Sequence, residues 1–426
     1  MIWRIKKLLI LCMIIPMIFI SGCFDASEPD DLAYVVAMGL DKGPEDNLII
    51  TLLLAVPIAV GVGPEPGEIE KSTNIVTVAA PTILGGINVI NSLISKRVNF
   101  AHAKLIVISK DLAEQGIEKI INTFIRFREF RPDTYLGITK GSAEEFLKSS
   151  KPLLEFNPSK HFELIMESFA YTGFSNGCTI EEFYSKMEST YEEAVALLLD
   201  VSRIQETKDL AEMISSRNRN GILEGDYTVG EIPVVYENKV RQMGSAVFRG
   251  DKMVGELTGL ETFYYLVVSG KLGEMYFTLP DFNESTDIAE NRDYITLRLG
   301  QARKPEISVK IKENIPVVDI KVSLEGDILA ITGRNDYSTG EGLKKLEKYA
   351  SEYIREKVVL FLEKTRDELN SDICFLGKYL KKTFLYWEDW IKFNWPEKYE
   401  KAQFNVNVEI KIRRSGIMVK QIPGII

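Results

Sequence analysis

The residue with the clearest chemical role in this sequence is Cys23, which directly follows Ile20-Ser-Gly22. Small residues before a cysteine, preceded by an apolar stretch and a basic start, are typical of bacterial export signals whose cysteine is lipidated. We therefore predict cleavage between Gly22 and Cys23. Cys23 would then carry S-diacylglycerol and N-acyl groups and would be the first residue of the mature protein.

The apolar stretch Leu8–Ile20 is too short to span a membrane comfortably. As a helix its 13 residues would cover about 20 Å, against about 30 Å for the hydrocarbon core of a bilayer. No later stretch approaches 20 uninterrupted apolar residues, so we expect a water-soluble body held by acyl chains at a membrane surface. The alternatives are an ordinary signal peptide or an uncleaved anchor.

The charge of the chain argues against electrostatic attachment. The net charge is −9, and removal of Arg4, Lys6 and Lys7 with residues 1–22 leaves −12. An acidic body gains nothing by approaching lipid or nucleic-acid phosphates. We therefore predict a bilayer contact through the acyl anchor and no nucleic-acid partner.

The remaining polar residues suggest no catalytic or metal site. The sequence lacks a Walker loop, a GxGxxG after a strand, a GxSxG elbow and an HExxH motif. Glu256 and Glu261 could form an acid/base pair, but paired carboxylates occur by chance on most surfaces. With only His102 and His161 and no CxxC, zinc has no ligand set. We predict no catalytic residue, no cofactor and no metal.

Two cysteines remain in the exported body, Cys178 and Cys374. We expect two buried free thiols, with a disulfide between them as the alternative. Trp387, Trp390 and Trp395 form an aromatic cluster that could grip a partner or a sugar. Because aromatic residues at this helical spacing usually pack inward, we expect them in the core.

A local excess of basic residues lies near the carboxyl end. Between Cys374 and Lys420, ten Lys or Arg residues stand against five acids. Lys411, Arg413 and Arg414 are our candidate partner-contact face, directed toward an acidic partner or lipid head groups. A solvated helix and strand surface is the alternative.

The pattern of the first half predicts a mixed sheet. Residues 31–43 and 47–56 are apolar, β-rich runs that suggest a hairpin. Strands at 104–109 and 134–139 alternate with helices that start near Asp111 and Ser142, the first of which should run unbroken to Ile125. These four elements predict a β-α-β-α unit.

The second half predicts hairpins and a long helix. A hairpin is expected over 243–257, and strict alternation marks antiparallel strands over 307–311 and 320–324. Ser338-x-x-Glu341 has the form of a capping box for a long helix near residues 341–370. A strand over 404–413 should close the sheet.

These elements together predict an α+β (mixed α/β), multi-domain fold with mixed or antiparallel sheets and covering helices. We expect a signal peptide over 1–22, an N-terminal mixed α/β domain over 23–205 and a linker region over 206–230. A C-terminal α+β domain should cover 231–426. A division of this last domain near residue 300 is an option.

Several segments in the same order resemble the Ger(x)C lipoproteins, the C subunits of spore germinant receptors. Cys23-Phe-Asp, Asp31-Leu-Ala and Gly39–Gly43 are similar to the start of the mature family members. Gly244–Thr262 resembles the hairpin and helix entry of the second domain in that family. Asn394-Trp395 and Val406–Gly416 resemble its carboxyl end.

The resemblance implies a lipid-anchored protein of the cell membrane, on the outer surface of the spore inner membrane. It implies A and B membrane subunits as partners, with ligand binding chiefly in the membrane-embedded one. The chain would then be a noncatalytic subunit for assembly and signal coupling in germination. The alternatives are a lipoprotein solute-binding protein of a transporter and a tethered cell-envelope hydrolase.

Overall fold

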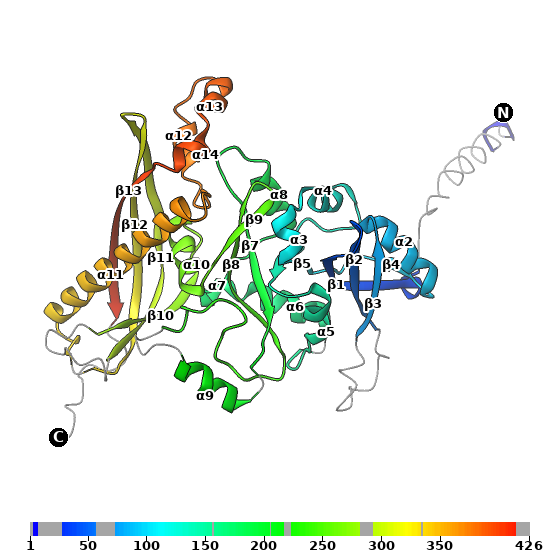
Figure 1. The fold of residues 1–426 in the computed structure, drawn as a ribbon, viewed down its shortest axis with the longest axis horizontal. Coiled ribbons are helices and arrows are strands. Elements are labelled where there is room, and N and C mark those ends of the chain that lie inside the picture. Colours follow the sequence, from blue (N-terminus) through cyan, green and yellow to red (C-terminus); the bar gives the residue numbers. More distant parts are fainter. Residues whose placement is uncertain are drawn as a thin grey trace.

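The computed structural model places two β-sheets side by side along the long axis of the molecule (Figure 1). It describes residues 3–6, 28–56, 73–155, 157–204, 206–216, 223–281, 293–333 and 335–414. The predicted cleavage and lipidation residues, Gly22 and Cys23, lie outside the described residues. In these ranges, helices long and apolar enough to cross a bilayer do not occur.

The larger sheet has nine strands in the described residues, ordered β3-β2-β1-β5-β6-β7-β8-β9 with β4 beside β1. The strands are β1 Leu32–Lys42, β2 Leu48–Ala55, β3 Thr73–Ala80, β4 Arg97–Asn99, β5 Leu105–Ser109, β6 Tyr135–Thr139, β7 Val195–Val201, β8 Val240–Arg249 and β9 Lys252–Leu257. Strands β1, β5, β6 and β7 run parallel, and the outer pairs are antiparallel. The predicted hairpin and β-α-β-α unit are confirmed as parts of this sheet.

Helices cover both faces of the larger sheet, which explains why β5 is fully buried and apolar on both sides. The helices of this half are η1 Pro29–Asp31, α2 Ile83–Leu93, α3 Lys110–Gln115, α4 Glu118–Arg126, α5 Ala143–Ser149, α6 Pro158–Glu167, α7 Phe169–Thr172 and α8 Ile180–Met187. α2, α3, α4 and α8 pack in one core with one face of the sheet. α5 and α6 pack on the other face.

The helix predicted to run unbroken from Asp111 to Ile125 is instead divided into α3 and α4. Gly116 has a φ of +118°, a conformation that favours glycine and interrupts the helix. The carbonyl of Asp251 accepts a hydrogen bond from the Ile117 amide at 3.0 Å. The turn between β8 and β9 therefore holds the start of α4, a contact between residues more than 130 positions apart.

Strands β8 and β9 extend the larger sheet, although they lie within the range predicted for the C-terminal domain, 231–426. β8 pairs with β7 in antiparallel register, from Val195 opposite Val247 to Val201 opposite Val240. Within the expected linker, α9 spans Thr207–Ser216 and residues 223–230 pack against the rest of the body, with Val229 fully buried. The larger sheet thus continues past the expected boundary.

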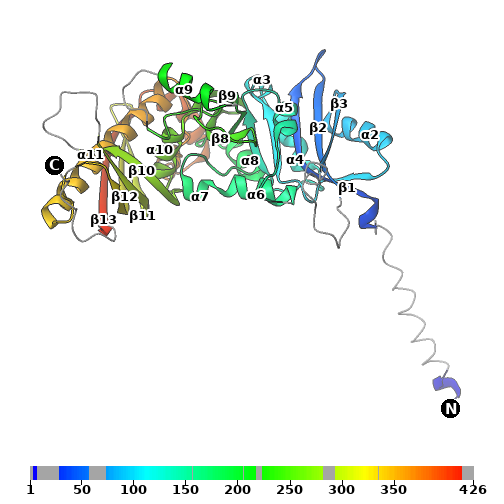
Figure 2. The same ribbon diagram turned by 90° about the horizontal axis from the view of Figure 1, so that it is seen from below.

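The smaller sheet has the order β10-β11-β12-β13, with β10 Glu274–Pro280, β11 Tyr294–Lys312, β12 Ile315–Ile331 and β13 Gln403–Arg414. β11 and β12 are antiparallel, as predicted, and β11 passes residue 300 without interruption. α11, Gly340–Asp367, lies across one face (Figures 1 and 2). β13 runs parallel to β12 because α11 and the following helices return the chain to the same end.

The predicted capping residue of the long helix is wrong by one position. Thr339 is the N-cap and accepts a hydrogen bond from the Gly342 amide at 3.0 Å. Ser338 instead donates its hydroxyl to Asp336 at 2.6 Å, which uses its side chain in the preceding turn. The long helix itself is confirmed.

Helix α10, Gly259–Ser269, lies between the two sheets and joins them into one core. Nine of its 11 residues are buried. Phe263 packs tilted against Phe277 of β10, and Thr262 hydrogen-bonds Ser245 of β8 at 3.0 Å between hydroxyls. Because a helix buried on nearly all sides must be largely apolar, the run Phe263–Val268 suits this place.

The last helical segments follow α11 as α12 Gly377–Lys381, α13 Trp387–Phe393 and α14 Trp395–Tyr399. Trp390 and Trp395 are buried, as predicted, whereas Trp387 is half exposed. Cys178 and Cys374 are buried free thiols, which confirms the preferred prediction for this pair. Burial raises the pKa of the Cys178 thiol to about 12, so it is held in its unreactive form.

Candidate functional site

The carboxyl ends of the parallel strands are where open α/β sheets usually bind ligands, and here the protein's own side chains occupy that edge. The buried carboxylate of Asp41, near the end of β1, accepts hydrogen bonds from the amides of Ala143 at 2.7 Å and Glu144 at 2.9 Å. It also accepts the hydroxyl of Ser142 at 3.1 Å. The start of α5 is therefore closed by an internal carboxylate.

On the other face of the same edge, Glu256 pairs with two lysines. Its carboxylate lies 2.7 Å from Lys110 Nζ and 3.2 Å from Lys140 Nζ. Burial opposes its ionisation, but the hydrogen bond from Lys110 and the charges of both lysines hold the pKa of Glu256 below its ordinary value. This residue is therefore an ionised structural partner.

Glu261, the other carboxylate weighed as an acid or base, is also engaged. It completes a capping box with Thr258 at the start of α10, and its carboxylate accepts two hydrogen bonds of 2.8 Å from Lys364 of α11. Glu256 and Glu261 thus each have separate cationic partners. Both carboxylates act as structural contacts between elements.

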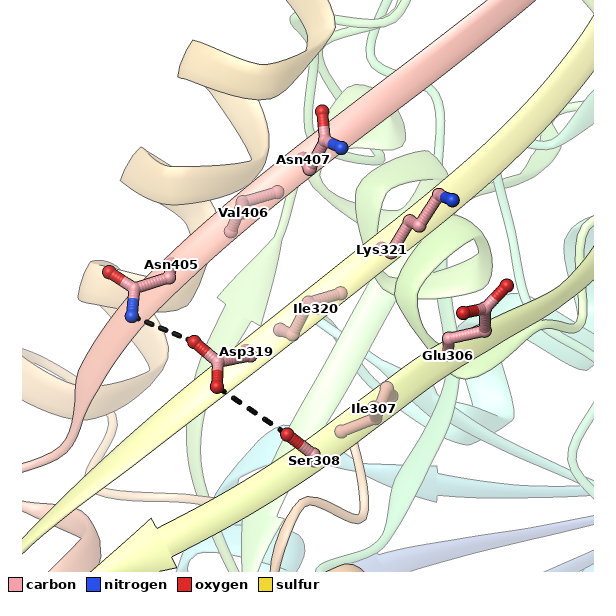
Figure 3. Close-up of a pocket in the computed structure, with 9 residues that line it drawn as sticks. All are labelled: Glu306, Ile307, Ser308, Asp319, Ile320, Lys321, Asn405, Val406 and Asn407. Carbon is pink, nitrogen blue, oxygen red and sulfur yellow. Dashed lines mark hydrogen bonds between the residues drawn. The ribbon is translucent and has the colours of Figure 1, made fainter.

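An open groove of about 440 Å³ lies over β11, β12 and β13 of the smaller sheet (Figure 3). Across it, Asp319 accepts hydrogen bonds from Asn405 at 2.9 Å and from Ser308 at 3.4 Å. The next row along the strands holds Glu306, Lys321 and Asn407. This groove is a polar sheet surface whose central carboxylate bonds its neighbouring strands.

The candidate partner-contact face lies at the far end of β13. Lys411, Arg413 and Arg414 are exposed there. Lys411 Nζ lies 3.5 Å from Glu347 of α11, and Arg413 Nε lies 2.9 Å from Glu325 of β12. Two of the three charges are therefore shared with carboxylates of this chain, and exposed pairs of this kind are weak enough to exchange for a partner.

The fold divides the basic residues between Cys374 and Lys420 into two separate groups. The lysines of α12 and α13 lie at the end of the smaller sheet where β13 begins, whereas Lys411–Arg414 lie at the opposite end (Figure 1). Any partner that contacts one group need not contact the other. Sequence proximity alone could not separate them.

A charged contact joins α8 to the segment after α11. Lys186, of which only 5% is exposed, lies 2.9 Å from Glu182. Lys271 also contacts Glu182, and both ammonium groups lie over the ring of Phe375. Burial disfavours the ionised form of Glu182, yet the charges of Lys186 and Lys271 hold its pKa below its ordinary value. This cluster fixes the two halves against each other.

We call the contact between the segment after α11 and the larger sheet the joint. Asp372 is the central polar residue of this joint. It is fully enclosed and accepts hydrogen bonds from the amides of Leu376 at 3.1 Å and Gly377 at 2.8 Å and from Trp395 Nε1 at 2.9 Å. Burial raises its pKa to about 6 despite these donors. Ser371 beside it donates to the carbonyl of Phe248 in β8 at 2.7 Å.

Glu193, before β7, is a second, half-buried acid at this joint. Its carboxylate accepts the Gly250 amide at 2.7 Å, and its own amide donates to the carbonyl of Asp372 at 3.3 Å. Burial, together with the nearby Asp372 charge, raises the pKa of Glu193 to about 7. The sequence analysis missed Glu193 and Asp372, because nothing in their neighbours marks an acid as buried.

The raised pKa of Glu193 predicts a pH-dependent stability. Its proton is bound more tightly in the folded state, so stability is full below pH 4.5 and is lost as pH rises to about 7. The loss should reach up to about 3 kcal/mol. We expect Glu193→Gln to flatten this dependence in urea unfolding at pH 5 and pH 8, with the exposed Glu188→Gln as control. An equally steep dependence in both variants would contradict the assignment.

The two histidines considered as zinc ligands are also placed by the fold. In the described ranges, groups of three or more His, Cys, Asp or Glu side chains that could hold a metal do not occur. His161 is buried beside Asn238, and burial lowers its pKa, so it remains neutral. His102 lies edge-on to Tyr34 at 5.0 Å between ring centroids. Both histidines have ordinary structural surroundings.

Comparisons with known proteins match two successive parts of the chain. The model of the spore germination protein N-terminal domain matches residues 25–201. The model of the spore germination B3/GerAC-like C-terminal domain matches residues 243–416. The second match begins within β8 and takes in β9, although in the structure both strands extend the first sheet.

Individual relatives match over almost the full length. Spore germination protein KC of Bacillus subtilis is 22% identical, over 97% of this chain and 96% of its own. Spore germination protein GerQC of Bacillus cereus is 20% identical, over 94% and 96%. The crystal structure of the GerBC protein has the same fold, with a TM-score of 0.50, 16% identity and coverage of 88% of this chain and 96% of its own. The chain therefore belongs to the Ger(x)C family of spore germination proteins.

Proposed function

We propose that this chain is a lipid-anchored, noncatalytic subunit of a spore nutrient germinant receptor. It would sit on the outer surface of the spore inner membrane, tied there by acyl groups on Cys23. Family membership supports the germination role. The export signal predicted to end at Gly22 supports the membrane anchor.

The observation that carries the proposal is the continuous core through α10. One apolar cluster includes Val195 and Val247 of the larger sheet, α10 itself and the inner face of the smaller sheet. A body built this way transmits a displacement at one end to the other without a flexible hinge between them. Such a body suits assembly and signal coupling between membrane subunits.

The inner contacts also favour a support role over catalysis. The usual ligand edge of the larger sheet is filled by Asp41 and by the Glu256 ion pairs. A solute-binding protein would instead need a cleft between two lobes that open and close. Calorimetry with amino acids on the purified protein separates the two, because micromolar binding would favour the solute-binding alternative.

The proposed partners are the A and B membrane subunits of the receptor. The test is affinity purification of the tagged chain from detergent-solubilised spore membranes. We expect an A-type subunit and a polytopic B-type subunit to co-purify, and deletion of the chain to slow nutrient-triggered germination at least tenfold. Recovery of the chain without membrane partners, with normal germination of the deletion strain, would disprove the proposal.

The same purification tests the candidate contact face. We expect the combined variant Lys411→Glu, Arg413→Glu and Arg414→Glu to reduce co-purification several-fold. The matched control reverses Lys119, Arg126 and Arg128, three exposed basic residues in and beside α4 of the larger sheet. Equal recovery with both variants would remove β13 from the interface and leave the rest of the proposal standing.

A further inference from the structure

An exposed apolar group stands on α13 and the residues just before it. Leu385 is 85% exposed, Tyr386 63%, Trp387 50% and Ile391 48%. We call these four residues the aromatic tip. They lie on the part of the molecule that extends past the end of the smaller sheet (Figure 1). Clustered exposure of large apolar side chains usually marks an interaction site.

The aromatic tip is held on a fixed support. Trp390, in the same helix, is 2% exposed, and its Nε1 donates to Thr190 Oγ1 at 2.9 Å. Its ring contacts Phe384, Phe393 and Trp395, with centroid separations of 5.4, 6.0 and 6.4 Å. The exposed residues are therefore presented by a packed aromatic cluster.

Basic residues of α12 and α13 lie near the tip in the chain, and one of them contacts it. Lys378, Lys382 and Lys392 are exposed, and Lys381 Nζ lies 5.0 Å from the centroid of the Trp387 ring. Glu388 and Asp389 are the acids of α13. At 100° per residue, Trp387 and Ile391 share one side of the helix, Glu388 and Lys392 lie together on its flank, and Asp389 points to the opposite side. The local balance is positive in a protein whose net charge is −9.

This chemistry fits the head-group region of a bilayer. Trp and Tyr are favoured where an apolar body and a polar edge are both accommodated, and lysine keeps its ammonium group among lipid phosphates. Four side chains are too few for a stable protein interface, which buries about 800 Å² on each partner. The positive rim complements an anionic lipid surface.

We propose that the aromatic tip inserts into the head-group region of an anionic bilayer, as a second membrane contact of this chain. In Figure 1, α13 lies on the side of the smaller sheet, whereas β1 lies toward the opposite end of the long axis. Two contacts at this separation orient the long axis along the membrane. The inference adds an orientation that the lipid anchor alone does not provide.

The test uses the full-length chain reconstituted in vesicles of equal parts phosphatidylcholine and phosphatidylglycerol. Part of the lipid carries bromine near the head group, where it quenches tryptophan fluorescence by contact. The difference between wild type and Trp387→Phe isolates the emission of Trp387. We expect bromine to reduce this difference signal at least twofold, and aqueous acrylamide to have little effect on it.

A charge variant sharpens the same measurement. Lys378→Glu, Lys382→Glu and Lys392→Glu together should remove at least half of the bromine quenching, whereas reversal of Lys119, Arg126 and Arg128 should leave it unchanged. If bromine does not quench the emission of Trp387 and acrylamide does, the proposal is overturned. A protein partner would then be the candidate to cover the aromatic tip. Because this readout does not depend on how the amino terminus is attached, its failure is separate from any failure of the lipid anchor.

Discussion

Replacing Cys23 by alanine is expected to abolish fatty-acid labelling of the protein and to lower nutrient-triggered germination at least tenfold. The sulfur of Cys23 would receive the diacylglyceryl group. Two acyl chains provide stable anchoring because each buried methylene contributes about 0.8 kcal/mol. Without them, attachment would depend on an uncleaved apolar stretch of only 13 residues, which is short for a bilayer. Labelling with a clickable fatty acid, membrane fractionation and germination assays measure the three effects.

Cys12→Ala provides the matched control for this prediction. Cys12 lies in the same amino-terminal segment but within the apolar stretch, so its replacement should leave labelling and germination unchanged. The folded body should also be unaffected by Cys23→Ala, because β1 begins only at Leu32. A Cys23→Ala protein that stays fully membrane-bound and active would show that the cysteine is not the anchor.

Replacing Asp372 by alanine should be the most destabilising single change at the joint between the two sheets. The substitution leaves the amides of Leu376 and Gly377 and the indole N–H of Trp395 without their acceptor. Each buried donor left unpaired costs about 1–3 kcal/mol. Relief of the buried charge offsets part of this, and we expect a net loss of about 3–5 kcal/mol in the free energy of unfolding.

Urea unfolding at pH 7, followed by tryptophan fluorescence, measures this loss directly, because Trp395 reports on the same site. Asp389→Ala is the control, since Asp389 is an exposed acid of α13. That variant should stay within about 0.5 kcal/mol of wild type. If the two variants unfold alike, Asp372 does not stabilise the joint.

The elements predicted correctly from the sequence are those whose apolar residues repeat with a regular period. The alternation over 307–311 and 320–324 gave two antiparallel strands because each has one face on the core and one face in water. The helix near 341–370 was recognised because Leu346, Ala350 and Ile354 return every turn to the same face. When one side of an element is buried, its apolar residues recur at a fixed spacing. This spacing can be recognised without knowing which element covers that side.

The errors arose where distant residues determine the outcome. The break at Gly116 is accompanied by a hydrogen bond from Ile117 to Asp251 in another hairpin. The shift of the cap to Thr339 is the local exception, because the neighbouring Asp336 takes the hydroxyl of Ser338. The hairpin over 243–257 was predicted, but its pairing with β7 was not. Strand order is set by which edges meet in three dimensions, and local sequence carries little record of that.

By itself, the sequence determined the features that depend on order and composition along the chain: the acidic body, the mixed α+β character and the likeness to a germination family. The export signal before Cys23 stays a prediction from the same pattern. Only the tertiary structure decided that α10 unites both sheets in one core, that Asp372 is buried, and that the tip residues Leu385 and Trp387 face outward while Trp390 faces inward. The physical reason is that burial and contact depend on segments brought together from distant positions. A residue type at one position does not specify what will cover it.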